Sequence, residues 1–149
     1  MLFRSRKKAK VSDTARPAID TAELNDVYVR LLRAATSARI PDDAYNAALR
    51  DVAALPDDDK SYFAQMQRGN TLSHRTWLRL NEKRHRMRLA WDAFFDDYDL
   101  MLCPVAVTAA FPHDQQGLRH LRTIVVNNKK VPVVDQRSEE HTSELQSQS

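Results

Sequence analysis

Acidic residues crowd one short stretch of the chain, where they could hold a divalent metal ion. Asp96, Asp97 and Asp99 supply carboxylate oxygens, which hard cations prefer as ligands. However, consecutive helical positions point in different directions, and no histidine joins these carboxylates at ligand spacing. We therefore interpret the acidic residues as the polar face of a helix, and we predict neither a metal ion nor an organic cofactor.

Histidines and the single cysteine are further candidates for site chemistry. His74 and His85 could share one helical face, but two histidines alone are weak support for a metal site. His113 followed by Asp114 could form an oriented imidazole, yet no nucleophile is identifiable nearby. Cys103 lies inside an apolar run, which favours packing over thiolate chemistry. We predict no catalytic residue in this chain.

Basic residues gather between positions 68 and 88, where Glu82 is the single acidic residue. A helix of this kind could follow a phosphate backbone. Several of the basic residues instead follow helical spacing opposite an apolar stripe, which is typical of a solvated face. We predict no nucleic-acid partner, and a basic helical nucleic-acid-binding or interaction module is the alternative function. The basic residues are Arg68, Arg75, Arg79, Lys83, Arg84, Arg86 and Arg88.

Helix boundaries are predicted from capping and turn residues. Asp20 and Glu23 have the spacing of a capping box, and Pro41 suits a first helical turn. Gly69 is predicted to end a helix as a left-handed cap. The predicted helices run from Asp20 to about Ser37, from Pro41 to Pro56, from Asp57–Asp59 to Gly69, and from about Ser73 to Tyr98. The apolar stripe of the last helix comprises Trp77, Leu80, Met87, Trp91, Phe94 and Tyr98.

An apolar run follows this last helix directly. Leu100–Cys103 is short enough to be a buried strand, and Pro104 ends it. The loop Val105–Ala110, closed by Phe111, would then open at the carboxyl end of the strand. Pockets of α/β enzymes usually lie at such an edge. The sequence therefore predicts that this loop forms part of a pocket wall.

Short strands are predicted near both ends of the chain. Ala9–Val11 is a strand or an extended entry segment. Thr123–Val126 and Val131–Val134 flank two asparagines and two lysines, a pattern typical of a hairpin because asparagine tolerates positive φ. Pro132 confines the second strand to a sheet edge or a bulge. The predicted fold class is α/β, mostly helical with three or four short strands, in a sheet completed elsewhere.

The last residues differ in composition from the rest of the chain. Residues 137–149, RSEEHTSELQSQS, contain one apolar side chain and are predicted to be disordered. They resemble translated sequencing adapter, so we assign the domain to residues 1–136 and treat 137–149 as a non-native tail. The sequence has no run of roughly 18 apolar residues and no signal-peptide pattern, so we expect a cytoplasmic protein without a membrane partner.

The segment WDAFFDDYDLMLCPV, residues 91–105, resembles the late region of amidase-signature hydrolases. Weaker similarity covers residues 68–84 and the hairpin near residues 122–132, where Asn128 replaces a usual glycine. The resemblance implies an α/β/α fold on a mixed sheet and cleavage of carbon–nitrogen amide bonds without a cofactor. Catalysis in that family uses two serines and a lysine, beside a Gly/Ser-rich loop that binds the oxyanion.

The catalytic part of such an enzyme is missing from this sequence. Its two glycines, Gly69 and Gly117, lie far apart, and no serine has a context that a lysine would activate. We therefore predict a partial domain, inactive alone and poorly soluble. The expected partners are the remainder of its own domain, a small amide substrate in the intact enzyme and a second copy in a homodimer. The predicted pocket wall comprises Pro104, Val105, Val107, Thr108 and Phe111.

Overall fold

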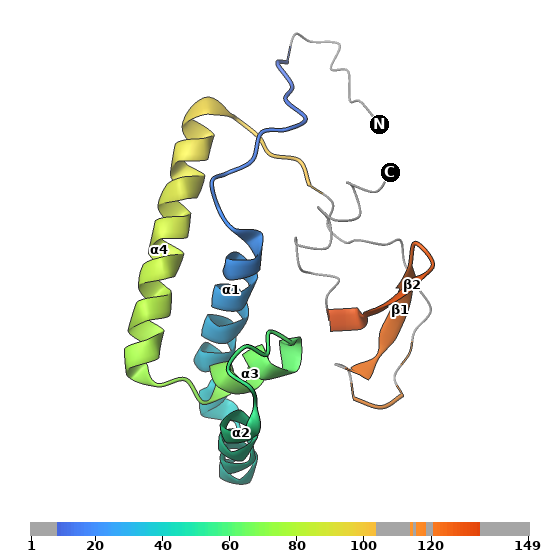
Figure 1. Cartoon of the computed structure of the whole chain (residues 1–149). Coiled ribbons are helices and arrows are strands. Elements are labelled where there is room, and N and C mark those ends of the chain that lie inside the picture. The colour runs from blue at the N-terminus through green and yellow to red at the C-terminus, as the bar shows by residue number, and fades with distance from the viewer. Residues whose placement is uncertain (1–8, 104–113, 115, 119–120, 135–149) are drawn as a thin grey trace.

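The computed structural model describes residues 9–103, 114, 116–118 and 121–134. Within these ranges the chain is mostly helical and carries one small antiparallel sheet (Figure 1). The elements are α1 (Thr21–Thr36), η1 (Ser37–Arg39), α2 (Asp42–Ala54), α3 (Tyr62–Asn70), α4 (His74–Asp97), β1 (Thr123–Val126) and β2 (Lys129–Pro132). The tail 137–149 lies outside the described residues, as does the predicted pocket wall.

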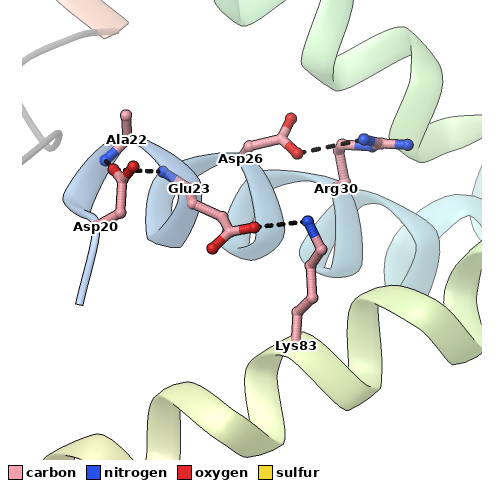
Figure 2. Close-up of polar contacts among 6 residues, drawn as sticks. All are labelled: Asp20, Ala22, Glu23, Asp26, Arg30 and Lys83. Atoms are coloured by element: carbon pink, nitrogen blue, oxygen red, sulfur yellow. Dashed lines mark hydrogen bonds and ion pairs between the residues drawn. The ribbon is translucent and has the colours of Figure 1, made fainter. Parts of the chain in front are cut away.

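Helix α1 begins at the predicted cap. The Asp20 carboxylate accepts hydrogen bonds from the backbone N–H groups of Ala22 at 2.8 Å and Glu23 at 3.2 Å (Figure 2). The reciprocal hydrogen bond of a capping box, from the Asp20 backbone N–H to the Glu23 side chain, is absent from these contacts. The Glu23 carboxylate instead accepts a hydrogen bond from Lys83 of α4. A tertiary partner has therefore replaced the local one that the sequence pattern predicted.

The core lies between α1 and α4, which run antiparallel (Figure 1). Val27 of α1 is 2% exposed, and Leu80 and Met87 of α4 are buried against it. Their spacing along α4 places both side chains on one helical face. The partly buried side chains packed around this core are Ile19, Leu24, Leu31 and Leu72.

Helix α3 packs against α1 at a glycine, and the predicted start of the helix and the predicted role of that glycine are wrong. The helix begins after Ser61, whose hydroxyl accepts a hydrogen bond from the Ala64 N–H, instead of at the preceding aspartates. Gly69 lies inside α3 and has no positive φ, so it is not a left-handed cap. A Cβ there would lie 2.6 Å from Cβ of Arg33 and 2.9 Å from the Arg30 carbonyl oxygen. The glycine therefore lets α3 approach the backbone of α1 closely.

The hairpin confirms the predicted role of the asparagines. Asn127 and Asn128 both have positive φ, of 47° and 64°, as a two-residue turn of a twisted hairpin requires. The second strand starts earlier than predicted, because Lys129 already pairs with Val126. Pro132 is its last residue and pairs with Thr123, which suits a residue without an N–H group. The tight turn thus brings the lysines into the strand.

Outside the hairpin, the structure corrects one predicted strand, Leu100–Cys103, and is compatible with the entry segment that was the alternative to a strand at Ala9–Val11. Residues 9–11 are described without strand pairing, as are Leu100–Cys103. The described sheet therefore has two strands, fewer than the three or four predicted. An extended segment becomes a strand only when a neighbouring backbone takes its hydrogen bonds. Within the described residues, neither segment has such a neighbour.

Candidate functional site

Helix α4 carries most of the residues that the sequence singled out. Its bounds, His74–Asp97, confirm the predicted helix. The Ser73 hydroxyl caps it by accepting a hydrogen bond from the Thr76 N–H at 3.2 Å. Tyr98 follows with extended backbone dihedral angles. One continuous helix therefore joins the core to the segment before Pro104.

The part of α4 from its start to Met87 is tied to α1. Beside the buried contacts of Leu80 and Met87, Lys83 donates a hydrogen bond to Glu23 at 2.5 Å (Figure 2). Both side chains of this ion pair are about half exposed, so the pair adds little stability. It does show the register of the helices, because Lys83, near the middle of α4, meets Glu23 near the beginning of α1. The part of α4 beyond Met87 therefore extends past the start of α1, as Figure 1 shows.

The last turns of α4 and the residue that follows the helix carry four aromatic side chains in contact with one another. We call Trp91, Phe94, Phe95 and Tyr98 the aromatic cluster. Phe94 stacks on Tyr98 with ring centroids 4.7 Å apart, and Trp91 stacks on Phe95 at 5.8 Å. Phe94 also meets Phe95 edge-on at 5.3 Å. Phe95 is 47% exposed and the others are partly buried, so the cluster presents aromatic surface to solvent.

The segment after α4 exposes its apolar side chains. The prediction that Leu100–Cys103 forms a buried strand is wrong for the chain as described. Leu100 is 80% exposed and Leu102 is 82% exposed, and Cys103 is exposed as well. The expected packing of Cys103 is therefore also wrong. The burial that the apolar run predicts requires a partner surface, and the described residues do not supply one.

The pocket-wall residues and His113 cannot be placed, because they lie outside the described residues. Asp114 is described and exposed, and its carboxylate accepts a hydrogen bond from the Gln116 N–H. Among the described residues, no three side chains of the metal-binding types gather closely enough to hold an ion. His74 stacks on Trp77, with ring centroids 6.3 Å apart. It thus makes an aromatic contact on the surface of α4.

Several of the basic side chains near α4 make local hydrogen bonds. Arg68 donates to the carbonyl oxygens of Pro56 and Asp59 and so holds the loop before α3. Arg84 donates to Asn81, and Arg86 pairs with Glu82. The predicted solvated face is confirmed, because each of its four members is exposed. These members are Arg75, Arg79, Lys83 and Arg86.

The loop before α3 also perturbs one titratable group. The pKa of the Asp59 carboxyl lies below its ordinary value of 3.8, chiefly because the backbone N–H of Ser61 donates to it at 2.8 Å. The Ser61 hydroxyl and the positive charge of Arg68 act in the same direction. This loop was not predicted from the sequence, although a serine before an apolar helix is a recognisable cap. The contacts stabilise the entry to α3 and suggest no catalytic chemistry.

The chain matches no known protein-family profile, no curated protein and no solved structure. Within the described ranges, no helix combines the length and the hydropathy that a membrane span requires.

Proposed function

We propose that residues 1–136 are the late region of an amidase-signature hydrolase, a cytoplasmic enzyme that cleaves carbon–nitrogen bonds of small amides. Its two catalytic serines and its lysine lie outside this chain, so the chain alone is inactive. The helices cover a larger mixed sheet. The wall of the substrate pocket follows Cys103 and comprises Pro104, Val105, Val107, Thr108 and Phe111.

The observation that carries this proposal is the exposed apolar surface from the aromatic cluster to Leu102. Full burial of one leucine or phenylalanine side chain contributes about 1.5–3 kcal/mol, so this arrangement leaves substantial stabilisation unused. Leu100 and Leu102 are each exposed by at least 80%. They lie in the segment whose sequence resembles the family, where the apolar run predicts a buried strand. Exposed surface of this kind supports an interface with further polypeptide of the same domain.

The hairpin supports the same proposal. An isolated two-stranded sheet is marginally stable in water. Ile124 and Val126 are nevertheless buried on one face of β1, while Val125 on the other face is 64% exposed. This alternation is typical of a strand that belongs to a larger sheet with one covered face. Pro132, at the end of β2, suits a hairpin at the edge of a mixed sheet, because proline has no N–H group to donate to a neighbouring strand.

Expression of the complete natural reading frame around these residues tests the proposal. The product should hydrolyse small aryl or aliphatic amides and should react with a fluorophosphonate probe, which labels activated serines. Its sequence should contain a Gly/Ser-rich segment before Met1. The 149-residue chain serves as the control and should not be labelled by the probe. A reading frame without that segment and without probe labelling would refute the proposal.

A salt titration distinguishes the alternative function, a basic helical module for nucleic acid. Binding to a random DNA duplex that weakens steeply with salt would favour the module, because phosphate contacts release counterions. Three local contacts argue against the module. Lys83, Arg84 and Arg86 are already engaged by Glu23, Asn81 and Glu82 of the chain itself. We expect no binding at physiological salt.

A further inference from the structure

Each strand of the hairpin directs some of its backbone groups toward the other strand and the rest outward. In an antiparallel pair, residues that exchange N–H···O bonds alternate with residues whose backbone groups point away from the partner strand. The Arg122 carbonyl accepts a hydrogen bond from the Val133 N–H at 2.8 Å, which sets this alternation. Along the observed register, the next bonded pairs are Ile124 with Val131 and Val126 with Lys129.

The outer edge of β1 is suited to take another strand. Thr123 and Val125 each direct an N–H and a C=O outward, at an interval of about 7 Å because a strand rises about 3.4 Å per residue. Both residues are exposed, and among the described residues these outward groups form no hydrogen bond. The strand itself carries neither a charged residue nor a proline. An edge of this kind is a template for further pairing, so folded proteins ordinarily cover it.

The outer edge of β2 is unsuited to further pairing. Its outward backbone groups belong to Lys130 and Pro132, and proline has no N–H to donate. Lys129 and Lys130 also place two positive charges on this short strand. Lysine and proline are residues by which edge strands avoid pairing with another strand. The strand β2 therefore has the composition of an outermost strand, whereas β1 has that of an inner one.

We infer that the outer edge of β1 pairs with a strand from the remainder of the same domain, so that β2 becomes the edge of the larger sheet. The partner is an extended segment, because alternate residues of a strand present N–H and C=O groups at the matching interval. A helix uses those groups for its own hydrogen bonds. The partner strand should carry apolar side chains on the side of Ile124 and Val126, since these two residues are buried.

The source of the partner strand rests on the proposed function, which places the remainder of the domain outside this chain. A second copy of the chain is a poorer source. Its β1 strand would contribute four residues to the contact, whereas a stable interface takes roughly 20–30 residues from each side. A strand inside the same domain needs no such area, because the rest of the fold holds it in place.

Amide hydrogen exchange at single-residue resolution tests this pairing in the product of the complete natural reading frame and in the 149-residue chain. In the complete protein, the protection factor of the Val125 N–H should exceed that of the Lys130 N–H by at least about a hundredfold, because a new strand accepts its hydrogen bond. In the 149-residue chain both N–H groups lie at free edges and should have similar, low protection. Low protection of Val125 in the complete protein would overturn the inference. Protection in the 149-residue chain that rises with its concentration would also overturn it, because a second copy would then occupy the edge.

Two matched proline substitutions, Val125→Pro and Lys130→Pro, supply a second measurement. The two residues pair in the register, both are exposed, and both direct their N–H away from the other strand. Neither substitution therefore removes a hydrogen bond within the hairpin. In the complete protein, Val125→Pro should lower the melting temperature by several degrees more than Lys130→Pro, because it alone removes a donor to the new strand. Equal losses in the complete protein would overturn the inference.

The exchange measurement needs no variant, so it decides the question even where Val125→Pro prevents folding. Labelling by the fluorophosphonate probe separates this pairing from the proposed function. A complete protein that is not labelled but protects Val125 would reject the hydrolase and retain the pairing. A complete protein that is labelled but leaves Val125 unprotected would reject the pairing alone.

Discussion

The parts of α4 before and after the end of its contact with α1 use the same helical spacing but have different surroundings. Up to Met87, Leu80 and Met87 are buried because α1 lies opposite them. Beyond Met87, the aromatic cluster extends past the start of α1, and Phe95 remains 47% exposed. The apolar pattern therefore identifies which face seeks burial, and the length of the neighbouring helix decides how much of that face is buried.

The largest loss of stability should come from a substitution in the part of α4 that α1 covers. Leu80→Ala should lower the free energy of unfolding by about 2–5 kcal/mol, because it removes buried contacts and leaves a cavity. Leu32→Ala is the matched control in α1, because the Leu32 side chain is 45% exposed. It should change the free energy of unfolding by less than about 0.5 kcal/mol. Urea unfolding measures both. Equal losses in the two variants would contradict the assigned core.

The close approach of α3 to α1 should be almost as sensitive. Gly69→Ala should destabilise the chain by about 1–3 kcal/mol, because the added Cβ would overlap Arg33 and the Arg30 carbonyl. Without that overlap, the same substitution would stabilise the helix by about 1 kcal/mol, because alanine is the better helix former. A loss of stability would therefore reveal the close approach of the two helices. Thermal unfolding provides the measurement, with Asn46→Ala on the exposed side of α2 as the control. A stabilised Gly69→Ala variant would show that the helices do not pack this closely.

The cap of α1 tests whether the covered region depends on local hydrogen bonds. Asp20→Ala should lower the free energy of unfolding by about 1 kcal/mol, because two backbone N–H groups lose their acceptor. Asp20→Asn should retain most of that stability, since an amide oxygen also accepts. Urea unfolding of both variants separates the hydrogen bonds from the charge. Equal losses would indicate that charge alone matters.

Substitutions in the part of α4 that α1 does not cover should change association more than stability. Phe95→Ser should change the free energy of unfolding by less than about 1 kcal/mol, because the ring is 47% exposed. It should reduce aggregation and the binding of a hydrophobic dye, since the exposed aromatic surface shrinks. Light scattering and dye fluorescence measure these effects, with Asp92→Ser as a control. A large loss of stability would show that the cluster is covered after all.

The smallest effect should be the acid sensitivity of the loop before α3. The folded pKa of Asp59 lies below its ordinary value, so its ionised form contributes stability above that value. The contribution disappears as the pH falls through the folded pKa. Asp59→Asn should therefore narrow the difference in melting temperature between pH 7 and pH 3. Asp57→Asn, without such hydrogen bonds in the described structure, should leave that difference unchanged.

Much of the helical organisation could be predicted because it depends on neighbouring residues. Asp20 and Ser73 cap their helices through N–H groups within three positions, and Asn127 with Asn128 adopts positive φ as their side chains allow. Helix α4 was predicted nearly to the residue. The pocket-wall residues remain predictions, since they lie outside the described structure.

The sequence alone therefore determined where α1 and α4 begin and which faces are apolar, because caps, turns and helical spacing act over a few residues. Tertiary structure decided the role of Gly69, the partner of Glu23 and the exposure of Leu100 and Leu102. Each of these depends on a surface distant in the sequence. For Gly69 that surface is α1, and for Glu23 it is α4. For Leu100 and Leu102, the described residues supply no such surface. Burial is a property of two surfaces, and a local pattern specifies only one of them.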